Sequence, residues 1–123
     1  MALDDEQLLL KQLPHSVEAE QAVLGSMLID PRCVPEVIDQ LRPDDFYLRQ
    51  NRDIYETIYS MFSYAKPIDG ITVCEEMQRL GTYDPQTTRS YLAQLMEITP
   101  TSANVMEYAA IVRDKALLRG VAA

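Results

Sequence analysis

The chain has 123 residues, a length that fits one domain able to bury an apolar core without metal or disulfide support. Hydrophobic residues make up 47 % and charged residues 24 %, a balance that excludes a disordered chain or a membrane chain. Because 19 Asp and Glu outnumber 11 Lys and Arg, the net charge of -8 argues against binding to nucleic acid phosphates or to an anionic membrane, and favours a protein partner.

The N-terminus and the two cysteines indicate a cytoplasmic protein. Residues 1–13 carry three carboxylates at positions 4–6, where a secretory signal would be basic, and no apolar run approaches the roughly 20 residues of a membrane helix. We interpret this segment as a flexible acidic arm. Cys33 and Cys74 have neither CxxC spacing nor a histidine beside them, which favours reduced, buried thiols over a disulfide or a metal site.

A first helix is predicted after Ser16, where apolar residues begin to recur every three or four positions. Ser16 can cap this helix, and Glu18 and Glu20 lie in its positively polarised first turn. The pair Asp30-Pro31 ends it, since proline cannot continue a helix beyond its first turn.

Two prolines, Pro31 and Pro35, allow two different starts for the second helix. The helix begins at Pro31 if this residue occupies the first helical position. It begins at Pro35 if residues 31–34 form a separate turn instead.

Four further helices complete the prediction. The third ends near Ala65, the fourth runs from its cap Asp69 to Gly81, which can adopt the left-handed conformation, and the fifth ends at Thr99. The sixth is capped within residues 101–102. The apolar stripes of these helices are Ile54, Tyr55, Ile58, Met61 and Phe62, then Ile71, Val73, Cys74, Met77 and Leu80, then Tyr91, Leu92, Leu95 and Met96, and finally Val105, Tyr108, Ala109, Val112 and Ala116. No segment alternates as a strand does, so the fold class is all-α, a compact bundle of about six helices.

Constellations of catalytic or ligand-binding residues are missing. The single histidine, His15, stands at the mouth of the first helix, where it can cap the helix or be solvated. None of the four glycines precedes a lysine, which excludes a GxxxxGK[ST] phosphate-binding loop within the chain. The pair Asp44-Asp45 lacks the further oxygen ligands of a calcium loop and is interpreted as the cap of a short turn. We therefore expect no catalytic, cofactor or metal site here.

The charge of the predicted fourth helix is wrong for reading DNA. A recognition helix presents Arg, Lys, Asn or Gln to phosphates and base edges. This helix carries Gln78 and Arg79 beside Glu75 and Glu76. We expect no direct DNA binding by this chain.

Short blocks of sequence between residues 13 and 119 follow the order and spacing of a known family. They are LPHSVEAEQAVLG at 13–25, PDDFY at 43–47, PID at 67–69 with ITV at 71–73, YLAQL at 91–95, PTSANV at 100–105, YA at 108–109, IVR at 111–113 and KALLR at 115–119. Together they resemble the N-terminal domain of DnaB-type replicative DNA helicases. Two places depart from the family pattern: Gly70 stands where an apolar residue is usual, and Thr88-Arg89 stand ahead of Ser90 where a glycine pair is usual.

The resemblance implies a domain organisation and a function. Residues 14–101 would form a helical head, and residues 102–123 the first arm of an antiparallel helical hairpin. In the family such hairpins pair two subunits, and three pairs form the collar of a hexameric ring, which recruits primase and a helicase loader in replication initiation and fork progression. The RecA-like domain that binds ATP and Mg²⁺ and unwinds DNA 5'-to-3' is expected outside this chain, which itself would be non-catalytic.

Seven residues are candidates for contacts with partner proteins. Glu18, Glu20 and Asp84 are carboxylates expected to face basic partner surfaces. Tyr91 is a further candidate. Ile111, Leu117 and Leu118 give the sixth helix more apolar surface than one buried face needs, as expected of a pairing surface.

The alternative function is a stand-alone helical adaptor with no helicase attached. A GxxxxGK[ST] motif encoded downstream of Ala123 would support the helicase, and a stop codon the adaptor.

Overall fold

The computed structural model describes residues 13–122, and the eight regular elements within them are all helical. Two are 3₁₀ turns, η1 (Pro31–Cys33) and η2 (Pro43–Asp45). The α-helices are α2 (Val17–Ile29), α3 (Val34–Gln40), α4 (Arg49–Ser63), α5 (Gly70–Leu80), α6 (Thr88–Glu97) and α7 (Val105–Leu118). Because no strand occurs in these residues, the all-α prediction is confirmed. The predicted arm over residues 1–13 lies outside the described residues except for Leu13.

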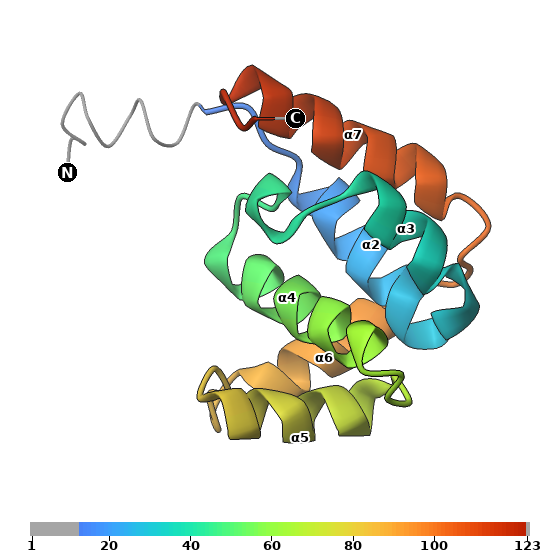
Figure 1. Ribbon diagram of the computed structural model, residues 1–123, viewed down its shortest axis with the longest axis vertical. Coiled ribbons are helices and arrows are strands. Elements are labelled where there is room, and N and C mark those ends of the chain that lie inside the picture. Colours follow the sequence, from blue (N-terminus) through green and yellow to red (C-terminus); the bar gives the residue numbers. More distant parts are fainter. Residues whose placement is uncertain (1–12, 123) are drawn as a thin grey trace, which may run out of the picture.

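Helix α2 is the centre of the bundle, with contacts to α7, α6 and α4. In Figure 1, α7 lies at one end of the molecule and α5 at the opposite end, with α2, α3 and α4 between them. The side chains of Val23, Leu24 and Met27 on α2 are fully buried. The apolar core is therefore built around α2, and the outer helices α5 and α7 each keep a face toward solvent.

Local capping determines three of the helix ends as predicted. The Ser16 hydroxyl accepts a hydrogen bond from the Ala19 amide at 3.1 Å, and the Asp69 carboxylate accepts one from the Thr72 amide at 2.8 Å. Gly81 ends α5 with φ of +82°, a conformation that costs glycine little.

The structure decides between the two predicted starts of the second helix, and it contradicts the predicted start of the last one. Residues 31–33 form the separate turn η1, and α3 begins at Val34 with Pro35 in its first turn. The predicted cap of the last helix is wrong, since α7 begins only at Val105. The Thr101 hydroxyl instead accepts from the Ala103 amide at 3.1 Å, and the Ser102 hydroxyl donates to Asp30 at 2.9 Å, so neither is available to cap.

Gly25 allows α2 to approach the end of α6. A Cβ atom at this position would lie 2.5 Å from the Leu95 carbonyl oxygen and closer still to the Thr99 hydroxyl. The absence of a side chain is therefore a condition of this helix contact.

The predicted apolar stripes are buried for the most part. Phe62 on α4 is 40 % exposed and Leu80 at the end of α5 is 43 % exposed, so, contrary to the prediction, these two residues do not belong to the core. Two further exceptions lie on α5 and α6. Ile71 is 74 % exposed and Met96 is 37 % exposed, whereas Val73 and Leu95 are fully buried. Both exposed side chains line a groove between α5 and α6 that no other described element covers.

Candidate protein-interaction surfaces

The predicted acidic contacts separate into two exposed residues and one buried one. Glu18 and Asp84 are exposed. Glu20 is only 1 % exposed, so the prediction that it faces a partner is wrong. Its carboxylate accepts hydrogen bonds from the Tyr47 amide at 2.8 Å and the Leu48 amide at 3.3 Å.

Glu20 is buried because its carboxylate accepts hydrogen bonds from donors at the start of α4. The N-cap of α4 is Leu48, whose side chain cannot accept a hydrogen bond, so its backbone amide donates to Glu20 instead. The side-chain amide of Asn51 also donates to the Glu20 carboxylate, at 3.0 Å. Free amide groups at a helix start need such acceptors. The acceptor comes from a different helix, 27 to 31 positions earlier in the chain, which explains why local pattern could not reveal it.

Tyr91 uses its hydroxyl inside the fold. The half-buried side chain donates to the Asn51 side-chain oxygen at 2.5 Å and accepts from the Gln21 side-chain amide at 3.3 Å. The residue thereby links α6 to α4 and α2. Because the Tyr91 hydroxyl is used in these two hydrogen bonds, any contact with a partner would involve the exposed part of the ring.

Helix α7 has apolar side chains on two faces. Val105, Ala109, Val112 and Ala116 are buried against the bundle. On the opposite side Ile111 is 39 %, Leu117 is 48 % and Leu118 is 69 % exposed, as the sequence predicted. We call these three residues the outer face of α7.

Two arginines fix α7 to the turn η2. Arg113 donates to the buried carboxylate of Asp45 at 2.5 Å. Arg119 donates to the carbonyl oxygens of Pro14 and Asp45, both at 2.8 Å. The partners lie 68 to 105 positions apart in the sequence, so the sequence offered no local signal for this contact.

Aromatic stacking extends the same contact. The Arg119 guanidinium lies 5.1 Å from the centre of the Tyr47 ring, and His15 stacks on Tyr47 with ring centres 4.3 Å apart. His15 is half-buried, with Nδ1 2.7 Å from the Leu13 carbonyl oxygen. It therefore neither caps α2 nor is fully solvated, and it helps to hold the chain entry against the C-terminal half of α7.

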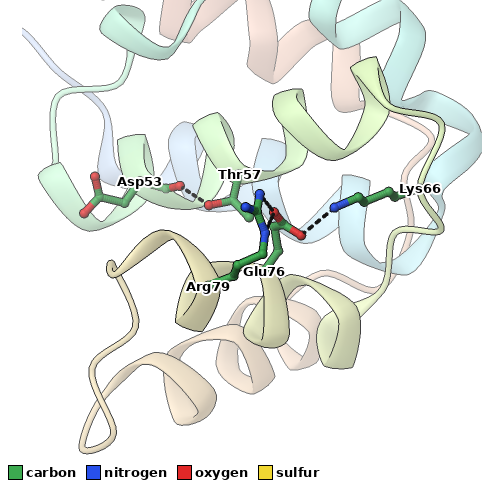
Figure 2. A network of polar contacts seen from close by, with 5 residues as sticks. All are labelled: Asp53, Thr57, Lys66, Glu76 and Arg79. Atoms are coloured by element: carbon green, nitrogen blue, oxygen red, sulfur yellow. Dashed lines mark hydrogen bonds and ion pairs between the residues drawn. The ribbon is translucent and has the colours of Figure 1, made fainter.

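Glu76 on α5 is a buried carboxylate with two basic partners, as Figure 2 shows. Lys66 donates to it at 3.0 Å, and Arg79 forms an ion pair with it one turn further along α5. The Arg79 and Lys66 hydrogen bonds hold the pKa of the Glu76 carboxyl below its usual range. The neighbouring Glu75 is exposed.

The groove between α5 and α6 has a volume of about 520 Å³ and a mostly apolar lining. Ile71 and Cys74 contribute from α5, and Leu92, Ala93 and Met96 from α6. Asp69, Glu75 and Arg89 stand at its rim. The spacing of most of these apolar residues predicted core positions, so the groove was not expected from the sequence.

No group of three His, Cys, Asp or Glu side chains within residues 13–122 is placed to hold a metal ion. Cys33 and Cys74 are free thiols, and burial raises the pKa of Cys33 to about 11 and also raises the pKa of Cys74. None of the helices in this part of the chain is long and apolar enough to cross a membrane.

Comparison with known proteins identifies the family. Residues 12–114 match the family model described as the DnaB-like helicase N-terminal domain. The chain belongs to this family. The DnaB-like domain is 41 % identical over 106 residues to the replicative DNA helicase DnaB of Leifsonia xyli subsp. xyli, and 42 % identical over 106 residues to that of Pasteurella multocida. Each alignment covers 86 % of this chain and 23 % of the relative, so the chain spans about a quarter of the length of these relatives.

Solved structures agree with the described fold. The crystal structure of the N-terminal domain of DnaB helicase from Mycobacterium tuberculosis matches with a TM-score of 0.83 and 39 % identity, over 88 % of this chain and 78 % of that chain. The N-terminal domain of DnaB helicase from Helicobacter pylori, described with its interactions with primase, matches with a TM-score of 0.71 over 97 % and 89 % of the two chains. Its 21 % identity shows the shared fold alone. The resemblance inferred from the sequence blocks is confirmed. These matches favour the N-terminal domain of a replicative helicase over a stand-alone adaptor.

Proposed function

We propose that this DnaB-like domain is the collar domain of a hexameric replicative DNA helicase and acts through protein contacts. In this proposal α7 is the first arm of a hairpin that pairs two subunits, and three such pairs close the ring. The collar recruits primase and a helicase loader in the cytoplasm. ATP and Mg²⁺ bind to a RecA-like domain elsewhere in a longer polypeptide, and the 123-residue chain does not hydrolyse ATP.

The observation that carries the proposal is the outer face of α7. Ile111, Leu117 and Leu118 expose apolar surface on a helix whose opposite side is already buried in the bundle. Arg113 and Arg119 hold the helix on the head, so this face has a fixed orientation. An exposed helix side that carries these apolar side chains, with the charged Glu107 and Asp114 beside them, suits pairing with a second helix.

Recruitment of other proteins is supported by charge. The exposed carboxylates of Glu18 and Asp84 contribute to a net charge of -8, which attracts basic protein surfaces and repels DNA phosphates. The related Helicobacter pylori domain is described with its interactions with primase. We place primase among the partners of this chain on these two grounds.

The test is the mass of the full-length product of the gene, measured by light scattering. Leu117→Glu combined with Leu118→Glu places two carboxylates on the outer face of α7 and is expected to convert hexamers into smaller species. Leu80→Glu is the matched control, because Leu80 is 43 % exposed on α5, at the other end of the molecule (Figure 1). Hexamers in all three proteins, or a wild type that is monomeric, would contradict the proposal.

A further inference from the structure

The groove between α5 and α6 runs along two turns of both helices. Gly70 and Met96 stand at one end of it, and Gln78 and Arg89 at the other. Ile71, which is 74 % exposed, also lines the groove. The groove is lined only by residues 69–78 and 89–96, and α7 lies at the opposite end of the molecule from α5 (Figure 1), so the groove is separate from the proposed pairing surface.

Gly70 keeps one end of the groove open at a cost to the helix. Glycine weakens a helix relative to alanine, because it loses more backbone freedom on folding. The fold does not require glycine here, since its φ is not positive and an added Cβ would meet only the flexible Met96 sulfur at 3.3 Å. Gly25, by contrast, is required by a close backbone approach. A side chain at position 70 would fit the fold but would enter the groove.

The charged groups at the rim indicate which charges a molecule bound in the groove would carry. Glu75 on α5 and Arg89 on α6 are exposed and form no ion pair within residues 13–122. Asp69 adds a second carboxylate on the α5 side. An occupant with apolar side chains toward the floor, a basic group beside Asp69 and Glu75 and an acidic group beside Arg89 would complement the rim.

We propose that this groove receives a short amphipathic helix of a partner protein. The inference rests on the proposed recruiting function, which makes primase the partner to test. A helix suits the site because the groove is open along its length and apolar side chains one turn apart would face its floor, as in other helix-in-groove interactions. Gly70 gives that helix room between α5 and α6.

The test measures binding of the primase encoded in the same genome to variants of the 123-residue chain by isothermal titration calorimetry. Ala93→Arg blocks the middle of the groove, and Gly70→Leu fills one end. Ala103→Arg is the matched control, since Ala103 is also an exposed alanine but lies in the turn before α7. We expect the two groove variants to weaken binding by about 10-fold or more, and the control to bind as the wild type does.

A second measurement separates binding from folding. Gly70→Ala is expected to raise the melting temperature by about 1–3 °C, because alanine favours the helix, and to weaken primase binding at the same time. A folding defect would lower both quantities together. Binding that is unchanged in Ala93→Arg, Gly70→Leu and Gly70→Ala would overturn the groove proposal and leave the proposed function intact. A wild-type chain that does not bind primase would contradict recruitment itself.

Discussion

Glu18 and Glu20 are both carboxylates in the first turn of α2, yet they have different roles. Glu18 is exposed, and its side chain forms no hydrogen bond with any other described residue. Glu20 is buried and accepts hydrogen bonds from two backbone amides and from Asn51 at the start of α4. A buried carboxylate with three donors is a structural group, and it is unavailable to a partner.

Replacing these two glutamates should have unequal effects on stability. Glu20→Ala leaves buried donors without an acceptor and is expected to lower the free energy of unfolding by about 3 kcal/mol. Glu18→Ala removes an exposed side chain and should change it by less than about 0.5 kcal/mol. Urea denaturation of the two variants measures the difference. Equal losses would show that the contacts of Glu20 contribute little.

At the scale of the helices, local chemistry explains those elements that could be predicted. Ser16 caps α2, and Asp69 and Gly81 bound α5, because each residue acts on backbone groups within a few positions of itself. The start of α7 was not predictable in this way. The Ser102 hydroxyl donates to Asp30, 72 positions away, and a local pattern contains no information about such a partner.

The same distinction applies to the candidate surfaces. The outer face of α7 was predictable, since a helix with apolar side chains on two faces can bury only one of them against its own bundle. The groove was not predictable, because the spacing of Ile71 and Met96 fits a buried stripe. Only the position of α5 at the end of the molecule leaves them uncovered (Figure 1).

The ion pairs of Glu76 predict a pH dependence of the stability of α5. Because Arg79 and Lys66 lower the pKa of Glu76 in the folded state, its contribution is fully present above the ordinary value of 4.5 and is lost as the pH falls through the lowered value. Wild type should therefore exceed Glu76→Gln in stability at neutral pH, and the difference should narrow as the pH falls below 4.5.

Thermal denaturation over this pH range measures that difference. Glu75→Gln is the matched control, because Glu75 is exposed and forms no ion pair within residues 13–122. Because this variant breaks no ion pair, its melting temperature should stay close to that of the wild type. A Glu76→Gln difference that widened in acid would contradict the assignment.

The whole molecule presents two apolar surfaces at opposite ends of one acidic bundle. Helix α7, with its exposed apolar residues, lies at one end, and α5, which forms the groove with α6, lies at the other, with α2, α3 and α4 between them (Figure 1). Such an arrangement allows one end to pair with a second subunit while the other contacts a different protein. A net charge of -8 is compatible with both contacts and unfavourable for DNA phosphates.

The claim that this domain acts in replication through proteins is tested most directly by two titrations in the same low-salt buffer. The 123-residue chain is titrated with the primase of the same genome and, separately, with single-stranded DNA, and heat or fluorescence anisotropy is recorded. We predict saturable binding of primase and no binding of DNA. Saturable, salt-sensitive binding of DNA together with no binding of primase would contradict it.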